Sequence, residues 1–121
     1  MTPRVLVVDD SPQFRAVAGA LLAERGLDLF AQAADGGQAL DAVATVCPDG
    51  ILLDINLPGP DGFTMATALA LACPQARIVL TSASVTFVPE RLLADCAAVA
   101  FVPKEELAGT DLGALFTPAG T

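Results

Sequence analysis

The chain has 121 residues, enough for one domain that buries a core of its own. Fourteen acidic against six basic residues give a formal net charge of −8, and Tyr and Trp are absent, which argues against direct nucleic-acid binding. Although 54% of the residues are hydrophobic, no stretch reaches the roughly 18 unbroken apolar residues of a membrane-spanning helix. The apolar run Val5–Val8 is cut off by Asp9 and Asp10, so it is no signal peptide, and we expect a soluble cytoplasmic protein.

Short apolar runs alternate along the chain with longer segments rich in Ala and Leu, which predicts strands that alternate with helices. The strands are expected at Arg4–Val8, Leu29–Ala33, Gly50–Leu53, Arg77–Thr81 and Ala98–Val102. The helices are expected at Pro12–Arg25, Gly37–Thr45, Gly62–Ala72, Pro89–Asp95 and within Lys104–Phe116. Strict alternation of this kind predicts an α/β fold, a parallel sheet with helices on both faces.

Local signals mark the ends of these helices. Ser11 followed by Pro12 is typical of a helix start, and Gly26 suits the residue just past a helix end. Pro48 and Pro74 are expected to close the second and third helices.

The three cysteines, Cys47, Cys73 and Cys96, lie far apart in sequence, and none belongs to a C-x-x-C pair. Their odd number and wide spacing favour buried free thiols in a reducing compartment over metal or redox chemistry.

Polar side chains follow four of the five predicted strands at their carboxyl ends. Ligands bind at this edge of open parallel sheets, so these side chains are expected to converge. Three carboxylates at one edge need a cation, and hard carboxylate oxygens suit Mg²⁺. One of the carboxylates could then act as a nucleophile toward a phosphoryl group, with the hydroxyl and the lysine neutralising its oxygens. The residues are Asp9 and Asp10, then Asp54, then Thr81 and Ser82, and last Lys104.

Each of these residues has a plainer explanation when taken alone. Asp10 could cap the first helix, and Lys104 could be a solvated charge at a helix start. Thr81 and Ser82 could satisfy backbone groups at a strand end. Their joint occurrence, in this order and each at a strand end, favours a functional site.

The same residues carry a resemblance to a known family. From about Arg4 to Leu107 the sequence resembles the receiver domain of two-component response regulators, the CheY-like family. The motifs are Val5–Asp10, Leu52–Gly62, Ile78–Ala83 and Phe101–Lys104. The resemblance implies a flavodoxin-like fold with five parallel strands in the order 2-1-3-4-5, and a single receiver domain over residues 1–121 whose last residues, 117–121, form a frayed tail.

The resemblance also implies roles for individual residues. Asp54 would be the phosphoacceptor that takes a phosphoryl group from a sensor histidine kinase. Asp9, Asp10, Asp54 and the backbone carbonyl of Asn56 would hold Mg²⁺. Lys104 would contact the phosphoryl group.

The switch that follows phosphorylation would use a hydroxyl and an aromatic residue. Thr81 and Ser82 are both available, and Ser82 is preferred because it precedes the small residue Ala83 and lies 22 positions before Lys104, the usual interval. Phe101 would be the aromatic switch residue, in a position where Tyr is frequent. An output protein or a C-terminal output domain would read the change, with no direct binding of nucleic acid or membrane by this domain.

Two features depart from the family pattern. The stretch Ala97–Ala100 lacks the glycines common there, which indicates a stiffer loop. The last helix contains Gly109 and Gly113 and is therefore expected to be weak. Since the face around this helix is the usual output surface of the family, the ordinary mode of dimerisation is in question.

The segment Phe63–Ala76 carries no charge, although a helix on the outside of a sheet usually has a solvated polar side. An alanine-rich composition with small exposed methyl groups explains this most simply. The alternative is a contact surface around Met65, Leu69 and Ala72, used by a partner or by a second copy in a homodimer.

Two other functions stay open on the residues alone. One is a phosphohydrolase or phosphotransferase that uses Asp54 as its nucleophile, although the chain has no histidine and little room for a substrate pocket. The other is a degenerate receiver that only binds proteins. The leading hypothesis is a signalling phosphoacceptor that catalyses its own phosphorylation and dephosphorylation.

Overall fold

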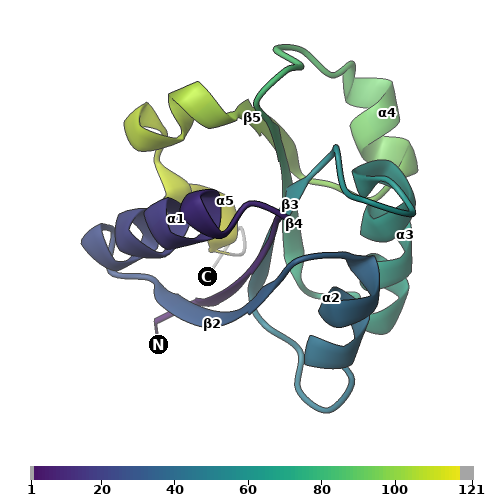
Figure 1. Cartoon of the computed structure of the whole chain (residues 1–121), viewed down its shortest axis with the longest axis horizontal. Coiled ribbons are helices and arrows are strands. Elements are labelled where there is room, and N and C mark those ends of the chain that lie inside the picture. Colours follow the sequence, from purple (N-terminus) through teal and green to yellow (C-terminus); the bar gives the residue numbers. More distant parts are fainter. Residues whose placement is uncertain (1, 118–121) are drawn as a thin grey trace.

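A five-stranded parallel sheet forms the centre of the protein in the computed structural model, which describes residues 2–117 (Figure 1). The strand order is β2-β1-β3-β4-β5, as the resemblance implied. The strands are β1 (Arg4–Val8), β2 (Asp28–Ala33), β3 (Gly50–Asp54), β4 (Arg77–Ser82) and β5 (Ala100–Pro103). The helices are α1 (Pro12–Glu24), α2 (Gly36–Ala42), α3 (Gly62–Ala72), α4 (Glu90–Asp95) and α5 (Leu112–Phe116), with a 3₁₀ helix, η1, at Lys104–Gly109.

Helices cover both faces of the sheet, with α1 and α5 on one side and α2, α3 and α4 on the other (Figure 1). Strand residues alternate between the two faces, so Leu6 and Val8 enter the core beneath α2 and α3, while Val5 and Val7 enter the core beneath α1 and α5. Because both faces are covered, β1 and β3 read as unbroken apolar runs.

The first and third helices begin where the sequence predicts. Ser11 Oγ accepts a hydrogen bond from the backbone N–H of Phe14, and Asp61 caps α3 in the same way through the N–H of Thr64. Gly26 follows α1 with a φ of 72°, a left-handed conformation that glycine adopts without steric cost.

The prediction that α2 extends to Thr45 is wrong, because the helix ends at Ala42 and Pro48 lies beyond it. The fifth strand starts at Ala100, later than predicted, because the chain first turns at Ala97, whose φ is 66°. Because this loop lacks glycine, an alanine takes the left-handed conformation.

The last helix is broken, as its glycines predicted. Lys104–Gly109 forms a 3₁₀ helix, and α5 contains only the five residues Leu112–Phe116. Phe116 nevertheless lies fully buried against β3, and a Cβ on Gly50 would come within 2.2 Å of its ring. The predicted frayed tail falls at 117–121, of which 118–121 lie outside the described residues.

The prediction of three free thiols is wrong, because Cys47 and Cys73 form a disulfide and only Cys96 is free and buried. Cys47 lies in the loop before β3 and Cys73 in the loop before β4. These strands are neighbours in the sheet, so the loops that lead into them meet at its amino edge despite a sequence separation of 26 residues.

The alternative of a contact surface around Met65, Leu69 and Ala72 fails at its first two residues, because Met65 and Leu69 are buried in the core between α3 and the sheet. Ala72 lies at the surface. The outward side of α3 exposes Thr64, Thr67 and Leu71, and the side chain of Leu71 is 80% exposed. Uncharged residues thus cover this surface, and one of them, Leu71, is large and apolar. Within residues 2–117, no helix is long and apolar enough to cross a membrane.

Candidate phosphoacceptor site

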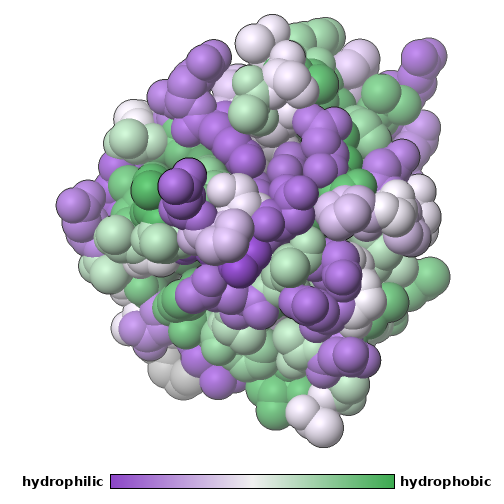
Figure 2. All heavy atoms as spheres, viewed as in Figure 1, coloured by the Kyte–Doolittle hydropathy of each residue, from purple (hydrophilic) through white to green (hydrophobic). Residues whose placement is uncertain are grey.

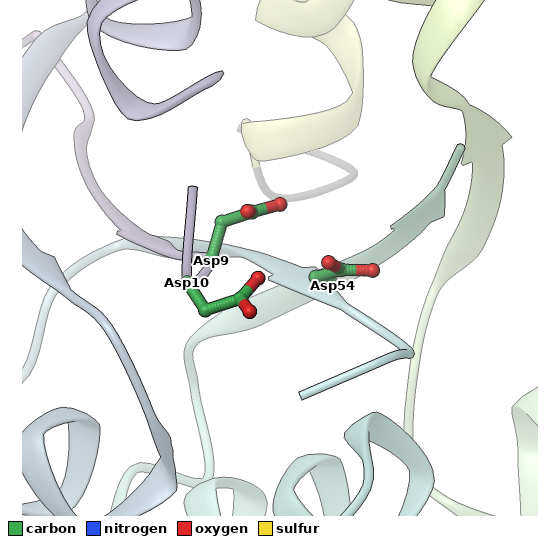
Figure 3. A group of neighbouring side chains, drawn as sticks. All are labelled: Asp9, Asp10 and Asp54. Carbon is green, nitrogen blue, oxygen red and sulfur yellow. The ribbon is translucent and has the colours of Figure 1, made fainter. Parts of the chain in front are cut away.

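Three carboxylates converge at the carboxyl edge of the sheet, as predicted. Asp9 and Asp10 follow β1, and Asp54 ends β3, the strand beside it (Figure 3). One oxygen from each of the three lies within 4.8 Å of the others. Asp9 is fully buried, Asp54 is 4% exposed, and Asp10 lies at the surface. In Figure 2 hydrophilic residues gather across the middle of the face shown, with hydrophobic side chains on both sides.

The ammonium of Lys104 lies against the two buried carboxylates. Its Nζ atom is 2.7 Å from Asp9 Oδ2 and 3.6 Å from Asp54 Oδ2. Lys104 is the first residue after β5, so it reaches Asp54 across the carboxyl end of β4 and Asp9 across the carboxyl ends of β4 and β3. The structure therefore brings the predicted lysine and the predicted acids into one cluster.

Backbone groups hold the other oxygens of the buried acids. Asp9 Oδ1 accepts from the N–H of Ser11 at 2.8 Å, and Asp54 Oδ1 accepts from the N–H of Asn56 at 3.1 Å. Burial raises the pKa of Asp54 above its ordinary value, and the nearby charge of Asp9 raises it further. The N–H of Asn56 and the charge of Lys104 lower the same pKa, without cancelling the effect of burial.

The two adjacent hydroxyls at the end of β4 have different surroundings. Ser82 Oγ accepts from the backbone N–H groups of Ser84 and Val85 and from the side-chain amide of Asn56. Thr81 Oγ1 is fully buried and has no hydrogen-bond partner among residues 2–117, although Thr81 lies beside Asp54 in the strand register. Ser82 is thus connected to the loops of the site, and Thr81 is enclosed in the sheet.

The start of α3 presses against the backbone of Asp54. A Cβ on Gly62 would lie 2.5 Å from the Asp54 carbonyl oxygen and 2.5 Å from Ile55 Cα. Backbone atoms cannot move aside as a flexible side chain can, so the close packing of α3 at this point requires glycine. The Asp61–Gly62 pair therefore caps a helix and allows it to lie against the site.

Sequence reasoning missed three side chains near the acids. Arg15 donates from Nη1 to the carbonyl oxygen of Asp9, and the ring of Phe14 lies 4.1 Å from Lys104 Nζ. Asn56 was assigned a role only through its backbone carbonyl, whereas its side-chain amide bonds Ser82 and Ser84. None of these side chains stands at a strand end, so the pattern that located the acids could not locate them.

The sequence matches the family model of the response regulator receiver domain over residues 5–112. The chain belongs to the response regulator receiver family. The match includes the strand ends that carry Asp9, Asp10, Asp54 and Lys104, so the acidic cluster described above lies within the matched receiver domain.

Proteins of known role that resemble this receiver include the chemotaxis protein CheY of Bacillus subtilis, at 34% identity over 69% of this chain and 69% of that protein. Among solved structures, the response regulator protein TrrA of Thermotoga maritima, determined in complex with Mg(2+)-BeF, is 30% identical. The match has a TM-score of 0.73 and covers 85% of this chain and 86% of that one.

A longer relative is a protein-glutamate methylesterase/protein-glutamine glutaminase of Myxococcus xanthus, 42% identical over 67% of this chain. The match covers only 24% of that enzyme. The likeness therefore concerns a receiver segment and carries no methylesterase chemistry to this chain.

Proposed function

We propose that this receiver domain is a phosphoacceptor in a two-component signalling pathway. In a Mg²⁺-dependent reaction, a carboxylate oxygen of Asp54 attacks the phosphorus atom carried by a histidine kinase. The bond from phosphorus to the donor breaks as an acyl phosphate forms on Asp54. Hydrolysis of the acyl phosphate, catalysed by the same site, ends the signal.

The observation that carries this proposal is that Asp54 lies beside both the ammonium of Lys104 and two further carboxylates. Its carboxylate is buried at the sheet edge, 3.6 Å from Lys104 Nζ, and belongs to the cluster with Asp9 and Asp10. Preorganised charges around a transferring phosphoryl group supply most of what such a reaction needs from a protein. Membership of the receiver family supports the same role.

The donor set fits Mg²⁺. Three carboxylates and one ammonium leave about two negative charges when all are ionised, and hard oxygens are the ligands that this ion prefers. Asp9, Asp10, Asp54 and the backbone carbonyl of Asn56 would hold it. The bound ion would supply neutralisation of phosphoryl oxygens, and TrrA, solved with Mg(2+)-BeF, gives a precedent within the family.

Ser82 and Phe101 are proposed to convert phosphorylation into a change of shape. Ser82 would move toward the phosphoryl group and carry the loop before α4 with it. Phe101 on β5 is partly buried against the core beneath α3 and α4, in register with Leu80 on β4, so its burial can respond to that movement.

Incubation with acetyl phosphate and Mg²⁺ tests the phosphoacceptor directly. Intact mass should show one added phosphoryl group on the wild type and none on Asp54→Asn. Asp41→Asn is the matched control, because Asp41 is an exposed acid on α2, and this variant should be modified normally. A wild type that stays unmodified here and with every histidine kinase tried would favour a receiver that only binds proteins.

The enzyme alternative predicts a different result. A phosphohydrolase would release far more than one equivalent of product from a small phosphate ester. A phosphoacceptor takes up one phosphoryl group per chain and accepts another only after its acyl phosphate has hydrolysed. The relation to CheY favours the signalling role.

The proposal extends to partners and location. A sensor histidine kinase would supply the phosphoryl group, and an output protein or a following output domain would read it, with residues 1–121 acting as a single receiver domain. We place the protein in the cytoplasm. The Cys47–Cys73 disulfide opposes that placement, because cytosolic thiols are normally kept reduced, so the thiol state in cells is a direct check.

A further inference from the structure

We propose that Phe14 is a positioning residue that holds the ammonium of Lys104 over the acid cluster during phosphotransfer. The inference rests on the proposed function, because it concerns the lysine that would contact the phosphoryl group. Phe14 lies on α1 and is not among the predicted site residues, none of which holds Lys104 through an uncharged group.

Three groups surround the Lys104 ammonium. Its Nζ atom lies 4.1 Å from the centroid of the Phe14 ring, 2.7 Å from Asp9 Oδ2 and 3.6 Å from Asp54 Oδ2. An ammonium within about 6 Å of a ring centroid and over the ring face is attracted by the negative face of the π system. Phe14 is therefore the uncharged member of a three-part cradle.

Hydrogen bonds fix the helical turn that presents Phe14. Asp9 Oδ1 accepts from the N–H of Ser11, and Ser11 Oγ accepts from the N–H of Phe14 at 3.2 Å. Asp9 thus binds Lys104 through one oxygen and, through the other, positions the turn that carries the ring. The contacts form a closed cycle of four residues.

A second set of contacts joins the carboxyl end of α1 to η1, the 3₁₀ helix that begins with Lys104. Arg25, which follows α1, donates from its guanidinium to the carbonyl oxygens of Ala108 and Thr110 at the end of η1. Because Lys104 begins η1, the helix and this segment are joined at both ends. The distance between Phe14 and Lys104 is therefore set by two independent sets of contacts.

The Phe14 ring matters because both carboxylates that bind Lys104, those of Asp9 and Asp54, gain another partner in the proposed reaction. Asp9 would hold the metal ion, and Asp54 would carry the phosphoryl group. Each change alters the attraction between that carboxylate and Lys104. The Phe14 ring binds neither the metal ion nor the phosphoryl group, so its attraction for the ammonium stays constant while the charged partners change.

A purely structural role for Phe14 is the simplest alternative. The side chain is partly buried and packs against the core beneath α1 and α5, where Ala18 and Leu22 lie on the same side of the helix. Packing alone would be satisfied by another apolar side chain of similar size. The electrostatic role requires a ring with an electron-rich face.

Fluorinated phenylalanines separate these two roles, because each added fluorine weakens the negative face of the ring with little change of shape. Mono-, di- and trifluorinated residues at position 14 should slow phosphorylation by acetyl phosphate at saturating Mg²⁺ in graded steps, reaching roughly two- to five-fold. Phe14→Leu should reach at least the same loss, and Phe14→Tyr should retain the wild-type rate. The same fluorine series at Phe30, which lies 5.1 Å from the guanidinium of Arg4, is the matched control and should leave the rate unchanged.

A second readout needs no phosphorylation. In metal-free protein, the side-chain ε protons of Lys104 should show an upfield ring-current shift by NMR that disappears in Phe14→Leu. If the wild type is phosphorylated but the fluorine series does not change the rate, the role of Phe14 is overturned and the proposed function stands. Absence of the upfield shift in metal-free protein overturns the role of Phe14 in the same way. A wild type that takes up no phosphoryl group contradicts the proposed function, and the positioning role falls with it.

Discussion

The side-chain amide of Asn56 donates a hydrogen bond to Ser82 Oγ at 3.1 Å and so joins the loop after β3 to the end of β4. The same amide bonds Ser84 Oγ at 3.0 Å, and Ser82 Oγ also accepts from the N–H of Val85. In this state the Ser82 hydroxyl is held by the loop that precedes α4. A movement of the hydroxyl toward a phosphoryl group on Asp54 would break these bonds, and the loop would lose the group that organises it.

Ser82→Ala should therefore separate phosphorylation from the response to it. The variant should still accept a phosphoryl group on Asp54, because the acids and Lys104 are unchanged. The amide resonances of residues 84–88 should shift much less on phosphorylation than they do in the wild type, as measured by NMR. Ser82→Thr keeps the hydroxyl and should restore the shifts; a full response in Ser82→Ala would rule out this hydroxyl as the switch.

Thr81→Val should stabilise the domain without affecting phosphorylation. Valine has nearly the same shape as threonine, and the exchange removes a buried hydroxyl that lacks a partner among the described residues. The free energy of unfolding, measured by urea titration, should rise by about 1 to 3 kcal/mol. If Thr81→Val abolishes the conformational response while Ser82→Ala retains it, the assignment of the two hydroxyls must be reversed.

The sheet and the acid cluster were predictable because one local pattern specifies both. An apolar run that ends in a carboxylate, as at Val8 and Asp9, indicates a buried strand and places the polar group at its carboxyl end. The strand order that the resemblance implied makes β1 and β3 neighbours, and their parallel pairing brings Asp9 beside Asp54. Lys104 follows from the same rule.

The remaining features depend on contacts that no local pattern contains. Phe14 reads as part of the apolar stripe of α1, and its contact with Lys104 appears only when η1 packs across the helix. The Cys47–Cys73 bridge depends on the order of the strands, which brings two distant loops together. The alternative that put Met65 and Leu69 on a contact surface arose because α3 has no charged residue to mark its outward side.

Ala97→Gly should stabilise the protein. Ala97 has a φ of 66°, where an L residue with a Cβ pays a steric cost of roughly 1 kcal/mol that glycine avoids. Urea titration should show a rise in the free energy of unfolding of about that size. Ala94→Gly, at an exposed position in α4, is the matched control and should lower it by about 0.5 to 1 kcal/mol. Equal losses in both variants would contradict the strain at Ala97.

Asp54 should make metal-free protein less stable as the pH rises. Burial raises the pKa of Asp54 in the folded state, so over the pH range just above the ordinary aspartate value the folded chain binds a proton that the unfolded chain has lost. The contribution of Asp54 to the free energy of unfolding is therefore most favourable at low pH and is lost as the pH rises through the raised pKa.

Asp54→Asn removes this titration. In EDTA the variant should have a higher free energy of unfolding than the wild type at neutral pH, and the difference should shrink as the pH falls toward about 3.9. Urea titrations followed by circular dichroism at several pH values measure it. A difference that stays constant with pH would argue against a raised pKa at Asp54.

Reduction of the Cys47–Cys73 disulfide should destabilise the fold and leave the phosphoacceptor site working. The bridge closes a long loop at the amino edge of the sheet, opposite the acids, so its loss should lower the free energy of unfolding by about 2 to 4 kcal/mol. Cys47→Ser should match the reduced wild type and be insensitive to a reducing agent.

Thiol labelling gives an independent check on the bridge. Without reductant, denatured wild type should take up a single alkyl group, at Cys96, and after reduction it should take up one at each cysteine. Full labelling without reductant would show that the bridge does not form. If reduced protein remains folded but is no longer phosphorylated on Asp54, the two edges of the sheet are coupled. The connecting element would be α3, because Cys73 caps its last turn and Gly62 packs its first turn against Asp54.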